Sequence, residues 1–338
     1  MLRTLMSLVS ICVCVPLTSC TVKERGEGEG EGEGEGEGEG EGEGEGEGDG
    51  GGEGEGEGEG EGPGFGGPIM IMAANYVAHA ATLRSNGPFI VYAWASDPAI
   101  ARYDTEIDTL LSISDPNIEK MIMFSSVDTM IEKVSSQAAE LRAGGVTMLG
   151  YNTECQGTGP GAPCRFTPTA EMNALDVDDG TNPVARFASF ADDEGFQAVW
   201  GGIRSVMDQV GSPAIGAMIA AGLDGIALQE QNFIHQACVD DRVEAVQTTT
   251  IRYRDLAAQQ GVTHFECHVQ VMPNRCEEGD AYAAQQCGAP AGDRFGHCAR
   301  FANTLEPDVQ SIAIWAMGTL VADLPALITR IRQVGEGS

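Results

Sequence analysis

Four polar residues alternate along one apolar run near the C-terminus: His264, Glu266, His268 and Gln270. Successive side chains of a β-strand point to opposite faces, so these four share one face and apolar residues occupy the other. Burying such groups without partners costs on the order of 2 kcal/mol each, so partners are required. The pattern predicts either a functional site or a buried polar network in which His264, His268 or Arg204 is the partner of Glu266.

Further polar residues stand at the C-terminal ends of other apolar runs. Asn152 and Glu154 share one face where a run over 146–152 ends, and Gln229 closes another run. Amides donate and accept hydrogen bonds, whereas a carboxyl can transfer a proton. Asn152 and Gln229 are therefore candidate ligand-binding residues, and Glu154 is a candidate acid/base.

Aromatic residues occupy comparable positions. Trp94, Trp200 and Trp315 lie in the C-terminal halves of three apolar runs, and Tyr92 lies close to the first of them. A single tryptophan is more often part of a core. Three at the same end of the second, fifth and eighth runs favour stacking platforms around one pocket for sugars or other flat ligands.

Eight short apolar runs must position these residues. They are 69–73, 89–95, 120–125, 146–152, 197–203, 225–229, 264–271 and 311–316. Most are continuously hydrophobic, as in parallel strands covered on both faces, and helical patterns separate them. One helical pattern follows Ser126 as a candidate N-cap and ends at Gly144-Gly145. Eight such repeats predict an α/β fold, a (β/α)8 barrel of TIM type, with an open doubly wound sheet as the alternative.

Seven cysteines follow Cys20, an odd number that leaves at least one without an intramolecular partner. Cys155 and Cys164 flank a Gly/Pro-rich stretch and are expected to form a disulfide. Cys267 lies inside an apolar run and is the expected free thiol. The others, with Cys238 as a possible fourth partner, lie in a second irregular stretch: Cys276, Cys287 and Cys298. Elaborated, disulfide-stapled loops are therefore predicted after strands four and seven, where they either wall a site or serve stability alone.

The sequence Tyr151-Asn152-Thr153-Glu154, together with the aromatic residues at strand ends, resembles the barrel glycoside hydrolases. The resemblance implies hydrolysis of a neutral carbohydrate by two carboxyls, with Glu154 as acid/base and Glu266 as nucleophile. Glu230 is an alternative second carboxyl, and Asp97 is a more distant one. The resemblance implies no cofactor. The residues expected to bind the substrate are Tyr92, Trp94, Asn152, Trp200, Gln229, His264, His268, Gln270 and Trp315.

Two alternatives use the same barrel. One is a non-catalytic protein that binds a carbohydrate or another ligand at the cell surface. The other is a metal-dependent hydrolase, in which neighbouring pairs among His264, Glu266 and His268 share an ion with a ligand from another strand. An acidic turn at 176–182 suits Ca²⁺, but its spacing is not that of an EF-hand and favours a solvated turn.

The N-terminus carries a targeting pattern. Residues 1–19 contain Arg3 and an apolar run that is too short to span a bilayer, as in a signal peptide. The run ends in Leu17-Thr18-Ser19-Cys20, which resembles the lipobox of bacterial lipoproteins. This implies cleavage before Cys20, lipidation of its thiol, and an exported protein anchored to the cell envelope. Thr21 favours the outer membrane, and an ordinary signal peptide is the alternative.

Residues 20–62 are predicted to form a disordered acidic linker. Its Gly-Glu alternation offers no apolar side chain to bury, and like charges extend the chain. The remaining domain, residues 63–338, holds 33 acidic and 16 basic residues, a net charge of −17. That charge argues against nucleic acid and anionic lipid as partners and favours a neutral or cationic ligand.

Overall fold

Eight parallel strands form a closed barrel in chain order, in which β8 pairs with β1. The computed structural model describes residues 64–95, 103–153, 169–175, 182–230, 234–316 and 318–333. The strands are β1 (Ile69–Met72), β2 (Phe89–Ala95), β3 (Ile118–Phe124), β4 (Val146–Asn152), β5 (Gln197–Ile203), β6 (Leu223–Gln229), β7 (Glu266–Val271) and β8 (Ser311–Ile314). The predicted TIM-type (β/α)8 barrel is therefore confirmed, and the open sheet is wrong.

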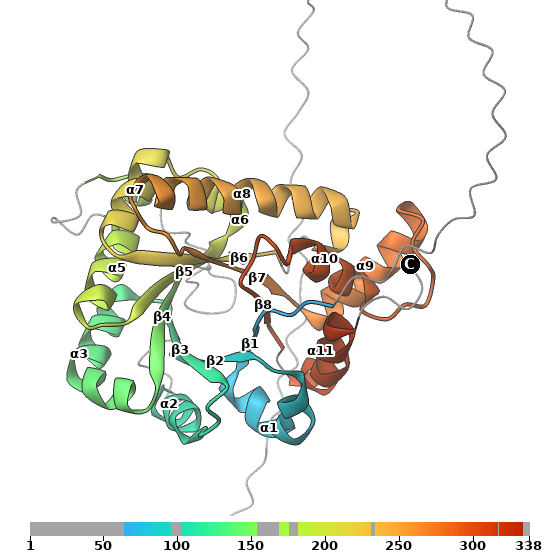
Figure 1. Ribbon diagram of the computed structural model, residues 1–338, viewed down its shortest axis with the longest axis horizontal. Helices are drawn as coiled ribbons and strands as arrows, with labels where there is room; N and C mark the ends of the chain where they lie inside the picture. Colours follow the sequence, from blue (N-terminus) through green and yellow to red (C-terminus); the bar gives the residue numbers. More distant parts are fainter. Residues whose placement is uncertain are drawn as a thin grey trace, which may run out of the picture. The chain divides into compact units, whose positions relative to one another are not determined.

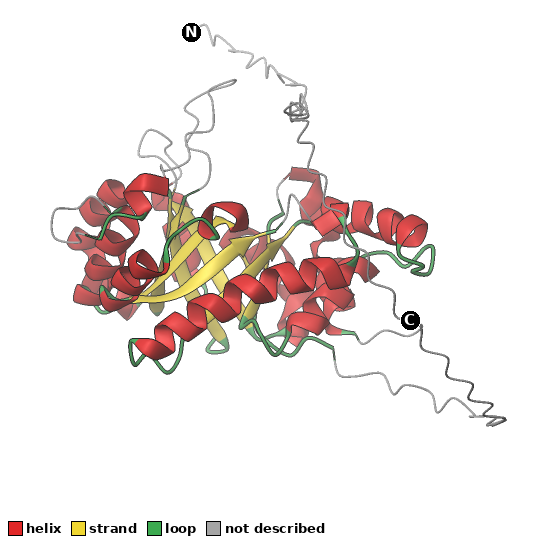
Figure 2. Ribbon diagram, turned by 90° about the horizontal axis from the view of Figure 1, so that it is seen from above, coloured by secondary structure: helices red, strands yellow, loops and turns green. Residues whose placement is uncertain are grey.

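Helices surround the barrel, as Figure 1 shows, and the strands lie inside the helical layer (Figure 2). The α-helices are α1 (Ala73–Leu83), α2 (Tyr103–Ser112), α3 (Val127–Ala143), α4 (Thr169–Met172), α5 (Pro183–Asp193), α6 (Arg204–Met207), α7 (Ser212–Ala220), α8 (Val239–Gln259), α9 (Pro273–Gln286), α10 (Gly296–Leu305) and α11 (Leu324–Arg332). Short 3-10 helices are η1 (Arg84–Asn86), η2 (Ile234–Gln236) and η3 (Gly318–Asp323). In the described part of the chain, no helix is long and apolar enough to cross a membrane.

Each strand divides its side chains between two cores. On β2, Val91, Ala93 and Ala95 belong to the large core between the strands and the helices. Ile90 and Tyr92 belong to a smaller core inside the barrel. Because both faces are buried, the strands are apolar throughout, which is why the runs could be recognised in the sequence.

Local signals fix the helix ends. Ser126 precedes α3, and its hydroxyl accepts a hydrogen bond from the Thr129 backbone N–H at 3.3 Å. Gly144 caps the C-terminus, and Gly145 adopts a φ of +83°, a left-handed conformation that suits glycine. These residues end α3 where the sequence predicted and let the chain turn directly into β4.

The segment after β7 is helical, not the irregular loop that was expected. It forms α9 and α10. One disulfide, Cys276–Cys298, joins α9 to α10, and the other, Cys238–Cys287, joins the end of α9 to the start of α8. As predicted, Cys267 is a buried free thiol, and burial raises its pKa to about 12.

Several predictions fall outside the described residues. These are the signal peptide, Cys20 and the acidic linker at 1–62, the bridge between Cys155 and Cys164, and most of the acidic turn. At the end of that turn, Asn182 is buried and caps α5. Its side-chain oxygen accepts the backbone N–H groups of Val184 and Ala185 at 3.1 and 3.0 Å.

The two disulfides should each stabilise the domain through the loop that they close. Their sequence separations are 22 for Cys276–Cys298 and 49 for Cys238–Cys287. Loop-closure entropy predicts that replacing each pair by serine lowers the free energy of unfolding by about 3 and about 4 kcal/mol, respectively. Urea denaturation measures both values. The control is Cys267→Ala, which removes a buried sulfur atom that forms no cross-link. This change should lower the free energy of unfolding by about 1 kcal/mol. Equal small losses in all three variants would contradict the cross-linking role.

Candidate functional site

A narrow cavity opens inside the C-terminal half of the barrel, where barrel enzymes place their sites. Its free volume is about 20 Å³, enough for about one water molecule between the side chains. Every described residue that lines it is uncharged: Met70, Tyr92, Trp94, Met123, Asn152, Gly201, Ala227, Gln229, Gln270, Ala313 and Trp315. Two larger hollows, one lined largely by α1 and one by α8, lie on the outer helical surface.

One half of this barrel mouth is aromatic. Trp94 on β2 and Trp315 just after β8 meet edge to face, with ring centroids 5.2 Å apart and an interplanar angle of 75°. Both rings are partly exposed, whereas Tyr92 below Trp94 is buried. Such rings offer apolar surface and little conformational freedom to a ligand.

The other half presents amide side chains from β4, β6 and β7. The Gln229 Nε2 group donates to the Asn152 Oδ1 atom at 2.7 Å, and both residues are 4% exposed. The Gln229 Oε1 atom is buried and has no hydrogen-bond partner among the described residues. Leaving a buried acceptor unpaired costs about 1–3 kcal/mol, so a hydrogen-bond donor placed next to the Gln229 Oε1 atom would be stabilised.

The barrel mouth therefore gathers six of the residues that the sequence predicted for binding. They come from five different strands or strand ends: Tyr92, Trp94, Asn152, Gln229, Gln270 and Trp315. Their role in binding stays a prediction, since the geometry shows only that they line one cavity. Small and flexible residues such as Gly201 and Met123 also line the cavity, and the sequence did not indicate them because their strands carry no polar alternation that marks the inward face.

Trp200 is not part of this cavity, which corrects its predicted placement. It is fully buried on the outer face of β5, where its ring packs at 6.3 Å from that of Tyr253 on α8. Its indole N–H donates to the Thr153 hydroxyl at 3.2 Å. Gly201, the next residue, takes the inward position.

His264 and Glu266 lie toward the opposite end of the barrel, because Glu266 is the first residue of β7, and His268 lies above them as the register partner of Ala227. The Glu266 carboxylate oxygens lie 3.2 Å from the His268 Nε2 atom and 3.5 Å from the His264 Nε2 atom. His268 is fully buried, and its Nδ1 lies 2.7 Å from the Ser311 hydroxyl. The polar network that was one interpretation of this strand is therefore present.

Electrostatics in this network favour an ionised Glu266. Burial alone would raise its pKa, but contacts and charges from His268 and His264 outweigh burial and lower the pKa below its usual value. Burial raises the pKa of Glu119 on β3, and the Glu266 charge adds to that increase. Arg204, once considered a partner of Glu266, binds elsewhere.

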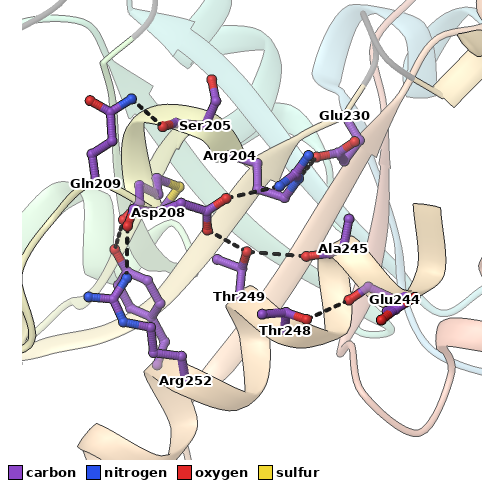
Figure 3. A network of polar contacts seen from close by, with 12 residues as sticks. Arg204, Ser205, Asp208, Gln209, Glu230, Glu244, Ala245, Thr248, Thr249 and Arg252 are labelled. Carbon is purple, nitrogen blue, oxygen red and sulfur yellow. Dashed lines mark hydrogen bonds and ion pairs between the residues drawn. The ribbon is translucent and has the colours of Figure 1, made fainter. Parts of the chain in front are cut away.

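Arg204 anchors a second network, outside the barrel wall (Figure 3). Its guanidinium contacts Glu230 at 2.6 Å and Asp208 at 2.9 Å. Thr249 on α8 donates its hydroxyl hydrogen bond to Asp208 at 2.7 Å. Glu230 is fully buried, and burial raises its pKa although Arg204 opposes the increase. This network joins the ends of β5 and β6 to α8 and so fixes the strand end that carries Gln229.

Among the described residues, no carboxyl lines the cavity. Glu154 lies outside the described residues, and Glu266 lies at the end of the barrel opposite the cavity. Glu230, the alternative second carboxyl, is held by Arg204 and does not line the cavity. Within the described residues, no group of three or more His, Cys, Asp or Glu side chains could hold a metal ion.

Comparison with known proteins gives no family assignment. No protein-family model matches the chain, and no curated protein matches it. A Mycobacterium tuberculosis tryptophan synthase structure is 12% identical, covers 79% of this chain and 93% of its own, and has a TM-score of 0.43. The tryptophan synthase A-subunit from Pyrococcus furiosus is 9% identical, covers 80% and 98%, and has a TM-score of 0.44.

The glycoside hydrolase prediction is wrong. Its predicted nucleophile, Glu266, is the first residue of β7 and does not line the cavity. A likeness of this low identity and TM-score gives no information about the activity of this chain.

The Glu266 network should support folding in a pH-dependent way. Because the folded state lowers the pKa of Glu266, its stabilisation is present above the unfolded pKa of about 4.3 and is lost as the pH falls through the folded value. Glu266→Gln should lower the free energy of unfolding by about 2 kcal/mol at pH 7, and the difference should disappear as the pH falls below the lowered pKa of the folded state. Urea denaturation across this range tests it. Glu132→Gln, an exposed change on α3, is the control, and equal pH profiles for the two variants would refute this role.

Proposed function

We propose that this domain binds a small, neutral organic ligand in the barrel mouth. The observation that carries the proposal is the unpaired, buried Gln229 Oε1 atom in the wall of a cavity whose other half is aromatic. A ligand with an apolar face and a hydrogen-bonding edge matches both halves. Neutral sugars and neutral heterocycles share this chemistry.

The charge pattern supports a neutral ligand. The described cavity wall holds no charged side chain, so a buried ionic group would lose its hydration without gaining a counter-ion. The domain's net charge of −17 disfavours polyanions such as nucleic acid. Binding of an uncharged compound agrees with both features.

The same proposal includes export and anchoring. The Leu17-Thr18-Ser19-Cys20 pattern supports lipidation at Cys20, and the acidic stretch that follows supports a tether between envelope and domain. The Cys276–Cys298 and Cys238–Cys287 disulfides agree with an oxidising compartment outside the cytosol. The ligand would then be met outside the cytosol.

Tryptophan emission tests the proposal directly. Of the three tryptophans, Trp94 and Trp315 line the cavity and Trp200 is remote, so Trp200→Phe provides a cleaner reporter background. Neutral sugars and neutral heterocycles are titrated against the full chain, and at least one compound should shift the emission saturably. Gln229→Leu should lower the affinity for that compound about tenfold, which is equivalent to about 1.4 kcal/mol for one lost hydrogen bond.

The control is Gln285→Leu, which changes an exposed glutamine on α9 and should leave affinity unchanged. A panel in which no compound shifts the emission would reject the binding function. Saturable binding that is equally tight in the Gln229→Leu variant would place the site elsewhere.

A further inference from the structure

Two glutamines stand side by side in the amide half of the barrel mouth. Gln229 on β6 and Gln270 on β7 are register partners, and both line the cavity. Neighbouring strands lie about 4.8 Å apart, so the two side chains reach the cavity as a pair. Any ligand that touches one of them can touch the other.

The hydrogen-bonding capacity of this pair is largely unused. The Gln229 Nε2 group already donates to Asn152, which leaves the Oε1 atom as a buried acceptor without a described partner. The Gln270 side chain makes no hydrogen bond to any described residue. The wall thus presents a fixed acceptor next to an amide whose N–H₂ group can donate.

From this pair we infer the class of the ligand: a flat ring with a cis-amide edge, as in a lactam, an imide or an uncharged pyrimidine base. The ring N–H donates to the Gln229 Oε1 atom, and the adjacent ring C=O accepts from the Gln270 Nε2 group. The inference rests on the proposed function and narrows it from neutral compounds in general to compounds with paired donor and acceptor.

Other ligand classes fit the pair less well. A carboxylate would set its negative charge against the Gln229 acceptor, and an ammonium group would leave the Gln270 donor unused. Neither would find a counter-charge on the described wall. A hydroxyl donates one hydrogen bond to either amide but lacks the coplanar donor and acceptor of an amide edge.

Gly201 leaves space beside the pair, and the flexible side chains of Met70 and Met123 narrow the rest of the cavity, so a ring enters only where they move aside. Gly201 lies between Asn152 on β4 and Ala227 on β6, its register partners, and lines the cavity. A Cβ atom placed there would lie 3.7 Å from Asn152, an ordinary contact distance. An alanine therefore fits without disturbing the barrel and occupies cavity space.

The test uses uracil and 1,3-dimethyluracil with the full chain, measured by calorimetry and tryptophan emission. The two compounds share a ring and differ in their N–H donors. Uracil should bind, and the dimethyl compound should bind at least tenfold more weakly. Gln270→Glu at pH 7 replaces the donor by an acceptor and should weaken uracil binding at least tenfold, whereas the exposed change Gln285→Glu should not.

Gly201→Ala supplies a steric variant whose fold should be retained, as checked by circular dichroism, and it should weaken uracil binding severalfold. Equal affinity for both uracils, or an unchanged affinity in Gln270→Glu, would overturn the inference. Binding of a neutral sugar without binding of uracil would also overturn it but would leave the proposed function standing. Absence of binding by every neutral compound would reject both.

Discussion

Side-chain alternation along strands that close into a ring is the constraint on which the rest of the structure depends. Closure gives every strand an inner and an outer face, and a one-residue shift would exchange the two. On β6, Ala227 and Gln229 point into the barrel and Leu228 packs under the helices. The chemistry of the cavity is therefore set by every second residue of each strand.

Polar groups inside the barrel have different partners below the cavity and beside it. Below it, His268 contacts the Glu266 carboxylate and the Ser311 hydroxyl, although the His268 Nε2 atom makes no hydrogen bond of good geometry. Beside it, the Gln229 Nε2 group donates to Asn152, and the buried Gln229 Oε1 atom has no partner among the described residues. Buried polar groups are normally paired, and of these two unpaired atoms only the Gln229 acceptor belongs to a residue that lines the cavity, so it is the one that indicates a ligand.

Much of the fold could be predicted because buried parallel strands are continuously apolar. The bounds of β2, β4 and β5 coincide with the apolar runs in the sequence. The inward set on β7 was also predictable, since polar and apolar residues alternate there. Which end of the barrel each residue occupies depends on where the strand begins, and β7 begins at Glu266, two residues later than the run suggested.

The errors have similar physical causes. β5 has no polar alternation, so its sequence does not reveal that Trp200 faces the helices and Gly201 the cavity. Arg204 follows β5, Glu230 follows β6, and Thr249 lies on α8. Their network forms only when these three elements meet in the fold, so the spacing of residues along the chain could not predict it. Disulfide-rich segments look irregular in sequence, yet Cys276 and Cys298 lie on helices that pack together.

A crystal structure of the domain with bound uracil tests most directly whether the barrel mouth holds a flat neutral ligand against Gln229 and Gln270. We expect difference density beside Trp94 and Trp315, with a ring nitrogen about 3 Å from the Gln229 Oε1 atom. Density confined to the outer hollow along α8, or a ring that contacts neither glutamine, would contradict it.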